Sequence, residues 1–207
     1  MPADLADVLA EADEDERGEI VKLLPPSLSG HALWELPEDE HPGDTLAALE
    51  PEQAAGIVDE LADDDAADLL GELEPEEQRL ILSKLEDPEQ REEVEELLQY
   101  DSESAGGLMT TQVVTVLAAD TVGAALDDVR QQAGEVEDCS EAYVIDEDRR
   151  LIGIMSFRRL VLASPDRPVR EVMEEPDAMV PPEMDQEEVA RIMARYNVSA
   201  IPVVDRE

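Results

Sequence analysis

Aromatic residues are scarce in this chain: phenylalanine, tryptophan and tyrosine together make up 2% of its 207 residues. Hydrophobic residues as a whole still make up 43%. A packed core is therefore available, but it has to be built from alanine, leucine, valine and isoleucine. The length suits one large domain or two small ones.

Cysteine is also scarce, and long apolar runs are missing. The single cysteine, Cys139, excludes an intrachain disulfide framework and is typical of a reducing compartment. No run approaches the roughly 20 apolar residues of a transmembrane helix, and no signal peptide is visible at the N-terminus. We therefore expect the chain as given to be soluble.

Basic residues are few, and 15 of them against 55 acidic residues give a formal net charge of −40. A surface of this charge repels phosphates, so we expect no nucleic-acid partner. Cations or a basic protein are the natural counterparts. Only Lys22 and Lys84 are lysines, which also fits a salt-rich cytoplasm, where a Debye length of about 3 Å at molar salt weakens self-repulsion. Salt adaptation and a functional acidic surface both remain open at this point.

A catalytic constellation is missing as well. The chain has no phosphate-binding P-loop, its two histidines are His31 and His41, and neither lies near Cys139 in the sequence. Acid pairs occur everywhere, so that none is diagnostic of hydrolytic chemistry. We predict that the chain is not an enzyme.

The first half contains an internal repeat of leucines spaced by 12 residues, with one step of 13. These leucines are Leu24, Leu36, Leu49, Leu61, Leu73, Leu85 and Leu97. Most are followed by proline or by acidic residues, which favour the first turn of a helix. Each unit is predicted to be one helix of about nine to eleven residues. Helices this short are marginal alone, so we expect them to stack into a curved solenoid over residues 1–100.

After residue 100 the pattern changes to alternating strands and helices. Strands are predicted at 113–116, 142–145 and 151–155, and helices at 121–132 and 157–163. The same order restarts at 169–173 and 179–180, followed by a helix at 186–196 and a strand at 201–204. Two β-α-β-β-α modules are implied, 101–165 and 166–207. The second stops after its middle strand, so we expect both ends of the chain to be cuts in a longer protein.

The best local candidate for a metal site is the acidic run that begins at Asp63. Asp64 and Asp68 lie one helical turn apart and share a face, and Asp65 is a near neighbour of Asp68. Carboxylates suit Mg²⁺, a hard cation that keeps several waters and takes one or two carboxylates per site. The alternative is that Asp63 to Asp65 simply cap a helix.

The chain resembles the cytosolic region of the MgtE magnesium channels. The resemblance is carried by the helical repeat, by Ala105-Gly106-Gly107-Leu108-Met109-Thr110, by Asp185-Gln186-Glu187-Glu188-Val189-Ala190-Arg191 and by Ile201-Pro202-Val203-Val204-Asp205. It implies an α + α/β fold in which an all-α superhelical solenoid precedes a pair of CBS domains, the second incomplete. It also implies a homodimer formed through the CBS domains, on the cytoplasmic side of the cell membrane and attached to a pore domain of the same chain. Bound Mg²⁺ would clamp the two acidic domains together and hold the pore shut.

The resemblance places Asp64 and Asp68 on the family's ion-binding positions of the helical domain, and it places Asp185 and Glu187 on acidic ligands of the second CBS motif. With Asp65, these are the predicted metal ligands. For Asp185 and Glu187 the alternative is again N-terminal charge on a helix. Two departures weaken one site that would be shared across domains: His31 stands where related channels carry a glutamate, and Asn197 where they carry an aspartate.

CBS pairs often bind adenine nucleotides through a Gly, two apolar residues, a Ser or Thr, and an Asp three positions later. Gly153-Ile154-Met155-Ser156 fits this signature, but Arg159 replaces the Asp. Arginine has no acceptor for ribose hydroxyls, so we expect no nucleotide cofactor. A nucleotide-sensing CBS module that controls another protein remains the alternative function, and a salt-adapted helical scaffold is a third.

Overall fold

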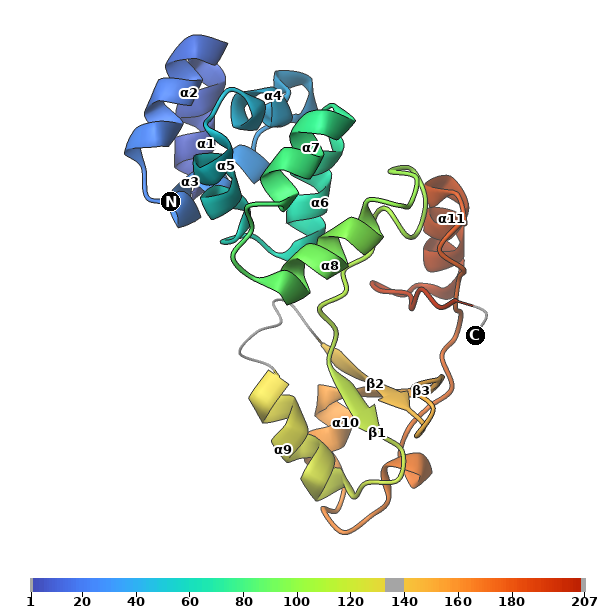
Figure 1. Ribbon diagram of the computed structural model, residues 1–207. Coiled ribbons are helices and arrows are strands. Elements are labelled where there is room, and N and C mark those ends of the chain that lie inside the picture. Colours follow the sequence, from blue (N-terminus) through green and yellow to red (C-terminus); the bar gives the residue numbers. More distant parts are fainter. Residues whose placement is uncertain (1, 133–139, 206–207) are drawn as a thin grey trace. The chain divides into compact units, whose positions relative to one another are not determined.

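A computed structural model describes residues 2–132 and 140–205, and its internal contacts divide the chain between Ser102 and Glu103 into two compact units (Figure 1). We call residues 2–102 the helical unit and the remainder the CBS unit. Cys139 lies outside the described residues. The finer limits at 1–100, 101–165 and 166–207 stay predictions.

The helical unit is a succession of short helices joined by tight corners. They are α1 (Pro2–Glu11), α2 (Glu14–Leu23), α3 (Pro26–Trp34), a 3₁₀ turn η1 (Glu38–Glu40), α4 (Pro42–Ala47), α5 (Pro51–Val58), α6 (Asp63–Gly71), α7 (Pro75–Leu82) and α8 (Pro88–Leu97). Proline stands in the first turn of α3, α4, α5, α7 and α8, where its missing N–H would be unpaired anyway. The predicted helix length of nine to eleven residues is too long for α4, which has 6 residues, and for α5 and α7, which have 8 each.

The helices pack in two alternating rows. In one row α1 contacts α3, α3 contacts α5 and α5 contacts α7; in the other, α2 contacts α4, α4 contacts α6 and α6 contacts α8 (Figure 1). Six of the repeated leucines close the corners and are buried: Leu36, Leu49, Leu61, Leu73, Leu85 and Leu97. Each short helix thus obtains its core from neighbours two steps away, as in a solenoid.

Side chains also bridge these rows at helix ends. Gln78 Nε2 donates to the Leu70 carbonyl oxygen at 3.1 Å, and Gln90 Nε2 donates to the Leu61 carbonyl oxygen at 3.0 Å. The Leu70 carbonyl also accepts from Leu73 N at 3.1 Å, so Gln78 adds a second donor there. The two glutamines therefore join the end of α6 to α7 and the corner after α5 to α8.

The first part of the CBS unit contains a three-stranded sheet of order β1 (Thr115–Leu117), β2 (Glu141–Ile145) and β3 (Leu151–Ser156). β1 pairs parallel to β2, and β2 pairs antiparallel to β3. The sheet shares one buried cluster with α9 (Val122–Gln132) and α10 (Phe157–Leu162). Together with the helical unit, this arrangement confirms the predicted fold class.

The later part of the CBS unit is less regular than the sequence suggested. Residues 169–171 form a 3₁₀ turn, η2 (Val169–Glu171), because Val172 N bonds back to the Val169 carbonyl oxygen at 2.9 Å. The helix at α11 (Gln186–Tyr196) has the predicted bounds. The strands expected at 179–180 and 201–204 shrink to a single bridge between Val180 and Val203. The first strand was also misplaced, since it begins at Thr115 rather than at Val113.

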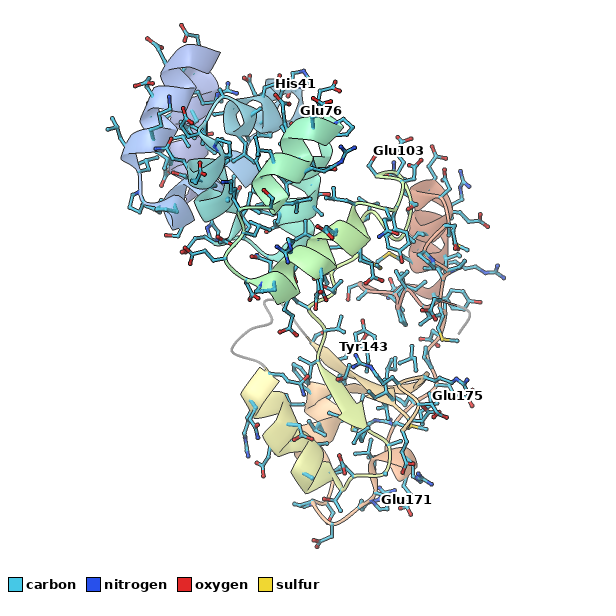
Figure 2. All side chains as sticks on the ribbon, viewed as in Figure 1. His41, Glu76, Glu103, Tyr143, Glu171 and Glu175 are labelled. Carbon is cyan, nitrogen blue, oxygen red and sulfur yellow. The ribbon has the colours of Figure 1, made fainter. Side chains whose placement is uncertain are left out.

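Exposed acidic side chains occur on both units: Figure 2 shows Glu76 on α7 and Glu171 and Glu175 in the CBS unit, all three exposed. Within residues 2–132 and 140–205, every helix is too short or too polar to cross a bilayer.

Candidate metal-binding residues

The acidic run lies on α6, whose first turn contains Asp63, Asp64 and Asp65. Negative charge there is favoured by the positive end of the helix dipole. The opposite face of the helix, with Leu69 and Leu70, packs into the core of the helical unit. This packing leaves Asp64 and Asp65 half-buried and Asp68 exposed.

The capping alternative for this run is wrong in its detail. The N-cap of α6 is Ala62, which has no side-chain cap hydrogen bond, so the aspartates follow the cap instead of forming it. Asp63 is the buried member of the run, 8% exposed. The carboxylates nearest to solvent are therefore Asp64, Asp65 and Asp68, the three that the sequence nominated.

The second pair of predicted ligands lies at the start of α11. Asp185 is the N-cap, and its Oδ1 accepts a hydrogen bond from Glu187 N at 2.9 Å. Glu187 Oε2 accepts from Arg191 at 2.6 Å, and both side chains are more than 70% exposed. Each residue thus has a structural task, and each retains a second carboxylate oxygen that these contacts do not use.

Sequence reasoning missed what fixes Asp185 in place. The segment that leads into Ala105-Gly106 pairs with the residues before α11: Ala105 N donates to the Met184 carbonyl oxygen at 2.7 Å, and Gly106 N donates to that of Pro182 at 2.8 Å. Gln186 N donates to the Glu103 carbonyl oxygen at 2.8 Å. Segment 103–106 is therefore a strap across the N-terminus of α11. The only signal for it was the pair of glycines.

No three histidine, cysteine or acidic side chains converge on one point within the described residues. Two carboxylates on one helical face still match Mg²⁺, because this ion retains several waters and takes one or two carboxylates from the protein. The donor set on α6 is thus compatible with Mg²⁺, whereas a fully dehydrated cage of protein ligands is not present there.

A further carboxylate group lies at the corner between α5 and α8. Asp59 accepts from Glu86 N through Oδ1 at 3.1 Å and Oδ2 at 3.3 Å. Burial raises the pKa of Asp59, and the charges of Glu86 and Asp87 add to the rise, against the lowering effect of the backbone donors. This carboxylate links two turns of the solenoid, which spacing along the sequence did not suggest.

The two departures from the family pattern have structural explanations. The Nδ1 atom of exposed His31 lies 2.6 Å from the Ser27 carbonyl oxygen on the same helix. Asn197 is the C-cap of α11 with φ 54° and ψ 45°, a left-handed conformation that asparagine tolerates well. Each residue therefore makes a local contact or cap within its own helix.

Arg159, which replaces the aspartate of the nucleotide signature, also has protein partners. Its guanidinium donates to the Val172 carbonyl oxygen at 2.9 Å and pairs with Glu174 at 2.6 Å. Ile154 and Glu174 exchange two backbone hydrogen bonds beside it, at 2.8 and 2.9 Å. The arginine therefore ties the connection after η2 to α10, and the backbone bonds tie it to the edge of β3.

Comparison with known families gives matches over both units. Residues 1–103 match the MgtE intracellular N domain, and residues 105–166 and 169–207 match the CBS domain. The magnesium transporter MgtE of Thermus thermophilus is 44% identical over 117 residues, which are 56% of this chain and 26% of the transporter. That of Enterococcus faecalis is 35% identical over 113 residues, 55% of this chain and 25% of the transporter. The matches span about a quarter of the length of these curated relatives.

Two solved structures are similar over nearly the whole chain. The cytosolic domain of the Mg²⁺ channel MgtE in complex with ATP superposes with a TM-score of 0.87 at 37% identity, covering 99% of this chain and 83% of that one. The soluble part of a magnesium transporter gives 0.83 at 32% identity, covering 97% and 78%.

Proposed function

Since this chain belongs to the MgtE family, we propose that it is the Mg²⁺-sensing regulatory region of a magnesium channel, which closes the pore when Mg²⁺ bridges acidic faces of its domains. The observation that supports this role most directly is the pair Asp64 and Asp68, one turn apart on α6 and turned away from the core. The role is regulatory and requires no catalytic group.

The physical basis is repulsion between carboxylates. At a net charge of −40, two acidic faces resist contact until a cation lies between them. Mg²⁺ binds such faces weakly and reversibly, because it keeps part of its water shell. A ligand that binds the closed arrangement better than the open one shifts the population toward closure.

The proposed ligands contribute in different ways. Asp64, Asp65 and Asp68 supply carboxylates from the helical unit. On α11, the oxygen of Asp185 that does not cap the helix is the donor. On Glu187 the donor is the oxygen that does not pair with Arg191, and giving up that exposed ion pair altogether would cost only about 0–1 kcal/mol.

The test is an Mg²⁺ titration of the chain at constant ionic strength, followed by limited proteolysis and small-angle scattering. We expect compaction and protection at millimolar Mg²⁺, and no such change with NaCl of equal ionic strength. In the double variant Asp64→Asn/Asp68→Asn, the midpoint should move to at least about tenfold higher Mg²⁺, since charged hydrogen-bonding groups contribute on this scale.

A matched control is Glu92→Gln/Glu96→Gln on α8. This pair has the same spacing and loses the same charge, and both glutamates are exposed. Its midpoint should stay near that of the parent chain. Equal shifts for the two double variants would mean that Mg²⁺ screens bulk charge only, and the proposed site would be abandoned.

We also propose that the protein acts as a homodimer through its CBS domains, on the cytoplasmic side of a membrane and attached to the pore domain of the same chain. Support comes from the family relationship. Sedimentation of the chain at several concentrations, with and without Mg²⁺, tests the dimer.

Nucleotide sensing is a second candidate, because one similar structure is a complex with ATP. Against it, Arg159 replaces the expected aspartate and is held by Val172 and Glu174. Calorimetric titration with ATP and AMP separates the candidates. A response to nucleotide with none to Mg²⁺ would favour a nucleotide-reading module.

A further inference from the structure

A cavity of about 270 Å³ lies where the carboxyl ends of β1 and β2 meet. Its walls are formed by the chain after β1, the β2–β3 hairpin and η2. Parallel strands often present their ligand sites at this edge. The volume is just below the roughly 300–1,000 Å³ of most small-molecule sites, so an occupant has to be small.

Charges of both signs line this cavity. Asp146, Glu147 and Asp148 come from the hairpin, and Arg170 comes from η2. Among the described residues, Arg170 forms no ion pair, and its one hydrogen bond is a long contact of 3.5 Å from Nε to the Ala118 carbonyl oxygen. The guanidinium thus keeps its terminal N–H groups available although carboxylates line the same space.

The remaining walls are apolar. Leu117 and Ile152 face the cavity, and Leu117 is 41% exposed. An apolar group placed against them would be removed from water, which is favourable in proportion to the area covered. The cavity therefore offers a guanidinium, carboxylates and a hydrophobic surface within one small volume.

We propose that this cavity binds a small zwitterion of the size of a free α-amino acid, with its carboxylate on Arg170, its ammonium on the Asp146–Asp148 hairpin and its side chain against Leu117 and Ile152. A simple anion would be repelled by the hairpin and by the net charge of the chain. A simple cation would leave Arg170 without a partner and close to a like charge. A zwitterion uses both sets of groups without adding net charge.

The hairpin holds the carboxylate of Asp146 in place. Asp146 Oδ1 accepts from Asp148 N at 2.9 Å and from Arg150 N at 3.0 Å. Arg149 adopts φ 62°, which turns the hairpin tightly. This ordering reduces the entropy that binding would otherwise cost.

The experiment is an NMR titration of the ¹⁵N-labelled chain with L-leucine at constant ionic strength. Shifts should concentrate at the amides of Ala118, Glu147 and Asp148. Two analogues test the contribution of each charged group: L-leucinamide lacks the carboxylate, and 4-methylpentanoate lacks the ammonium. Each should bind at least about tenfold more weakly, the cost of one lost charge-assisted hydrogen bond.

Arg170→Gln should weaken the binding of L-leucine by a similar factor. It should not weaken the binding of L-leucinamide, which then no longer lies close to a like charge. Arg158→Gln is the matched control, because it removes the same charge from an exposed position on α10 outside the cavity. Absence of shifts at these amides with tens of millimolar L-leucine overturns the proposal. So does equal binding of L-leucinamide and L-leucine, which would mean a plain cation-attracting surface. Either result leaves the Mg²⁺ titration, with its own site on α6, unaffected.

Discussion

The helices of the helical unit and α11 are all short and amphipathic, but their apolar side chains are buried to very different extents. In the helical unit, Leu9, Leu33, Leu46 and Leu70 are fully buried. In α11, with 11 residues, not one residue is buried within the described structure. The apolar positions of α11, Val189, Ile192 and Met193, are only partly covered.

The difference shows that neighbouring helices of a repeat provide a shared apolar core, which a single short helix lacks. Each inner helix of the solenoid contacts neighbours two steps before and after it, and each end helix contacts one such neighbour. Helices of 6 to 10 residues thus become stable together. α11 is held mainly at its ends, by the strap 103–106, the Asp185 cap and the Asn197 turn. Within the described residues, α11 therefore has caps and backbone bonds at its ends but no fully buried side chain.

The largest expected effect contrasts the two kinds of burial. Leu70→Ala should lower the free energy of unfolding of the helical unit by about 4 kcal/mol, because it leaves a cavity in a closed core. Ile192→Ala on α11 should cost less than about 1 kcal/mol. A urea titration followed by the amide NMR signals of each unit measures both. Comparable losses would mean that α11 has a core partner after all.

The general architecture could be predicted from the sequence, because the spacing of apolar residues indicates which face of a helix is buried. The leucine spacing predicted the solenoid, and the bounds of α11 followed from its apolar pattern and from Asp185 before it. Strand details were not accessible. The hydrophobic run at 201–204 predicts a strand, but a strand also needs a partner, and Val203 finds one bridge only.

The second contrast concerns arginines. Arg17 is 4% exposed and makes three hydrogen bonds as donor. Nε donates to the Leu9 carbonyl oxygen at 3.1 Å, Nη1 to the Glu40 carbonyl oxygen at 2.7 Å, and Nη2 to the Glu40 carboxylate at 2.6 Å. Arg17→Met should destabilise the helical unit by about 3 kcal/mol, since buried acceptors lose their donors. Arg191→Met breaks the exposed pair on α11 and should cost about 0–1 kcal/mol.

Thermal unfolding followed by Trp34 fluorescence reports the first of these changes, because Trp34 is the one tryptophan and lies in the helical unit. Far-ultraviolet circular dichroism of both variants checks that the helices are retained. If Arg17→Met unfolds with the parent midpoint, the buried arginine has no net stabilising role.

The third contrast tests the close approach of two successive helices of one row, α4 and α6. A Cβ atom at Gly43 would lie 2.6 Å from Glu72 Cβ and 3.1 Å from the Leu69 carbonyl oxygen. A Cβ atom at Gly56 would meet no described atom within 4 Å beyond the backbone of its own helix and its chain neighbours. Gly43→Ala should therefore cost about 2 kcal/mol through overpacking. Gly56→Ala should instead stabilise the unit by about 0.5–1 kcal/mol, as alanine is the better helix former. Chemical denaturation of the two variants shows whether each substitution raises or lowers the free energy of unfolding.

The candidate site was only partly accessible from the sequence. Spacing placed Asp64 and Asp68 on one helical face, and the structure keeps them out of the core. Tertiary contacts were hidden, because Asp59 and Glu86 are far apart in the chain and meet only when the solenoid closes. The same limit applies to Arg159, whose partners lie on the connection after η2.

The smallest expected effect is a pH dependence at the corner between α5 and α8. Burial, and after it the charges of Glu86 and Asp87, raise the pKa of Asp59 in the folded chain. A carboxyl group whose pKa is raised by folding holds its proton more tightly in the folded state. Its contribution to stability is therefore complete below the unfolded pKa and is lost as the pH rises through the folded pKa.

An NMR titration of the Asp59 carboxyl carbon tests this cause. Glu86→Gln removes one of the repelling charges and should lower the pKa of Asp59, while the backbone N–H of residue 86 remains to donate. Glu92→Gln, on an exposed face of α8, removes the same charge elsewhere and should leave the pKa of Asp59 nearly unchanged. A pKa of Asp59 at or below its ordinary value in the parent chain would show that the corner is well solvated. The corner between α5 and α8 would then add no pH dependence to the stability of the helical unit.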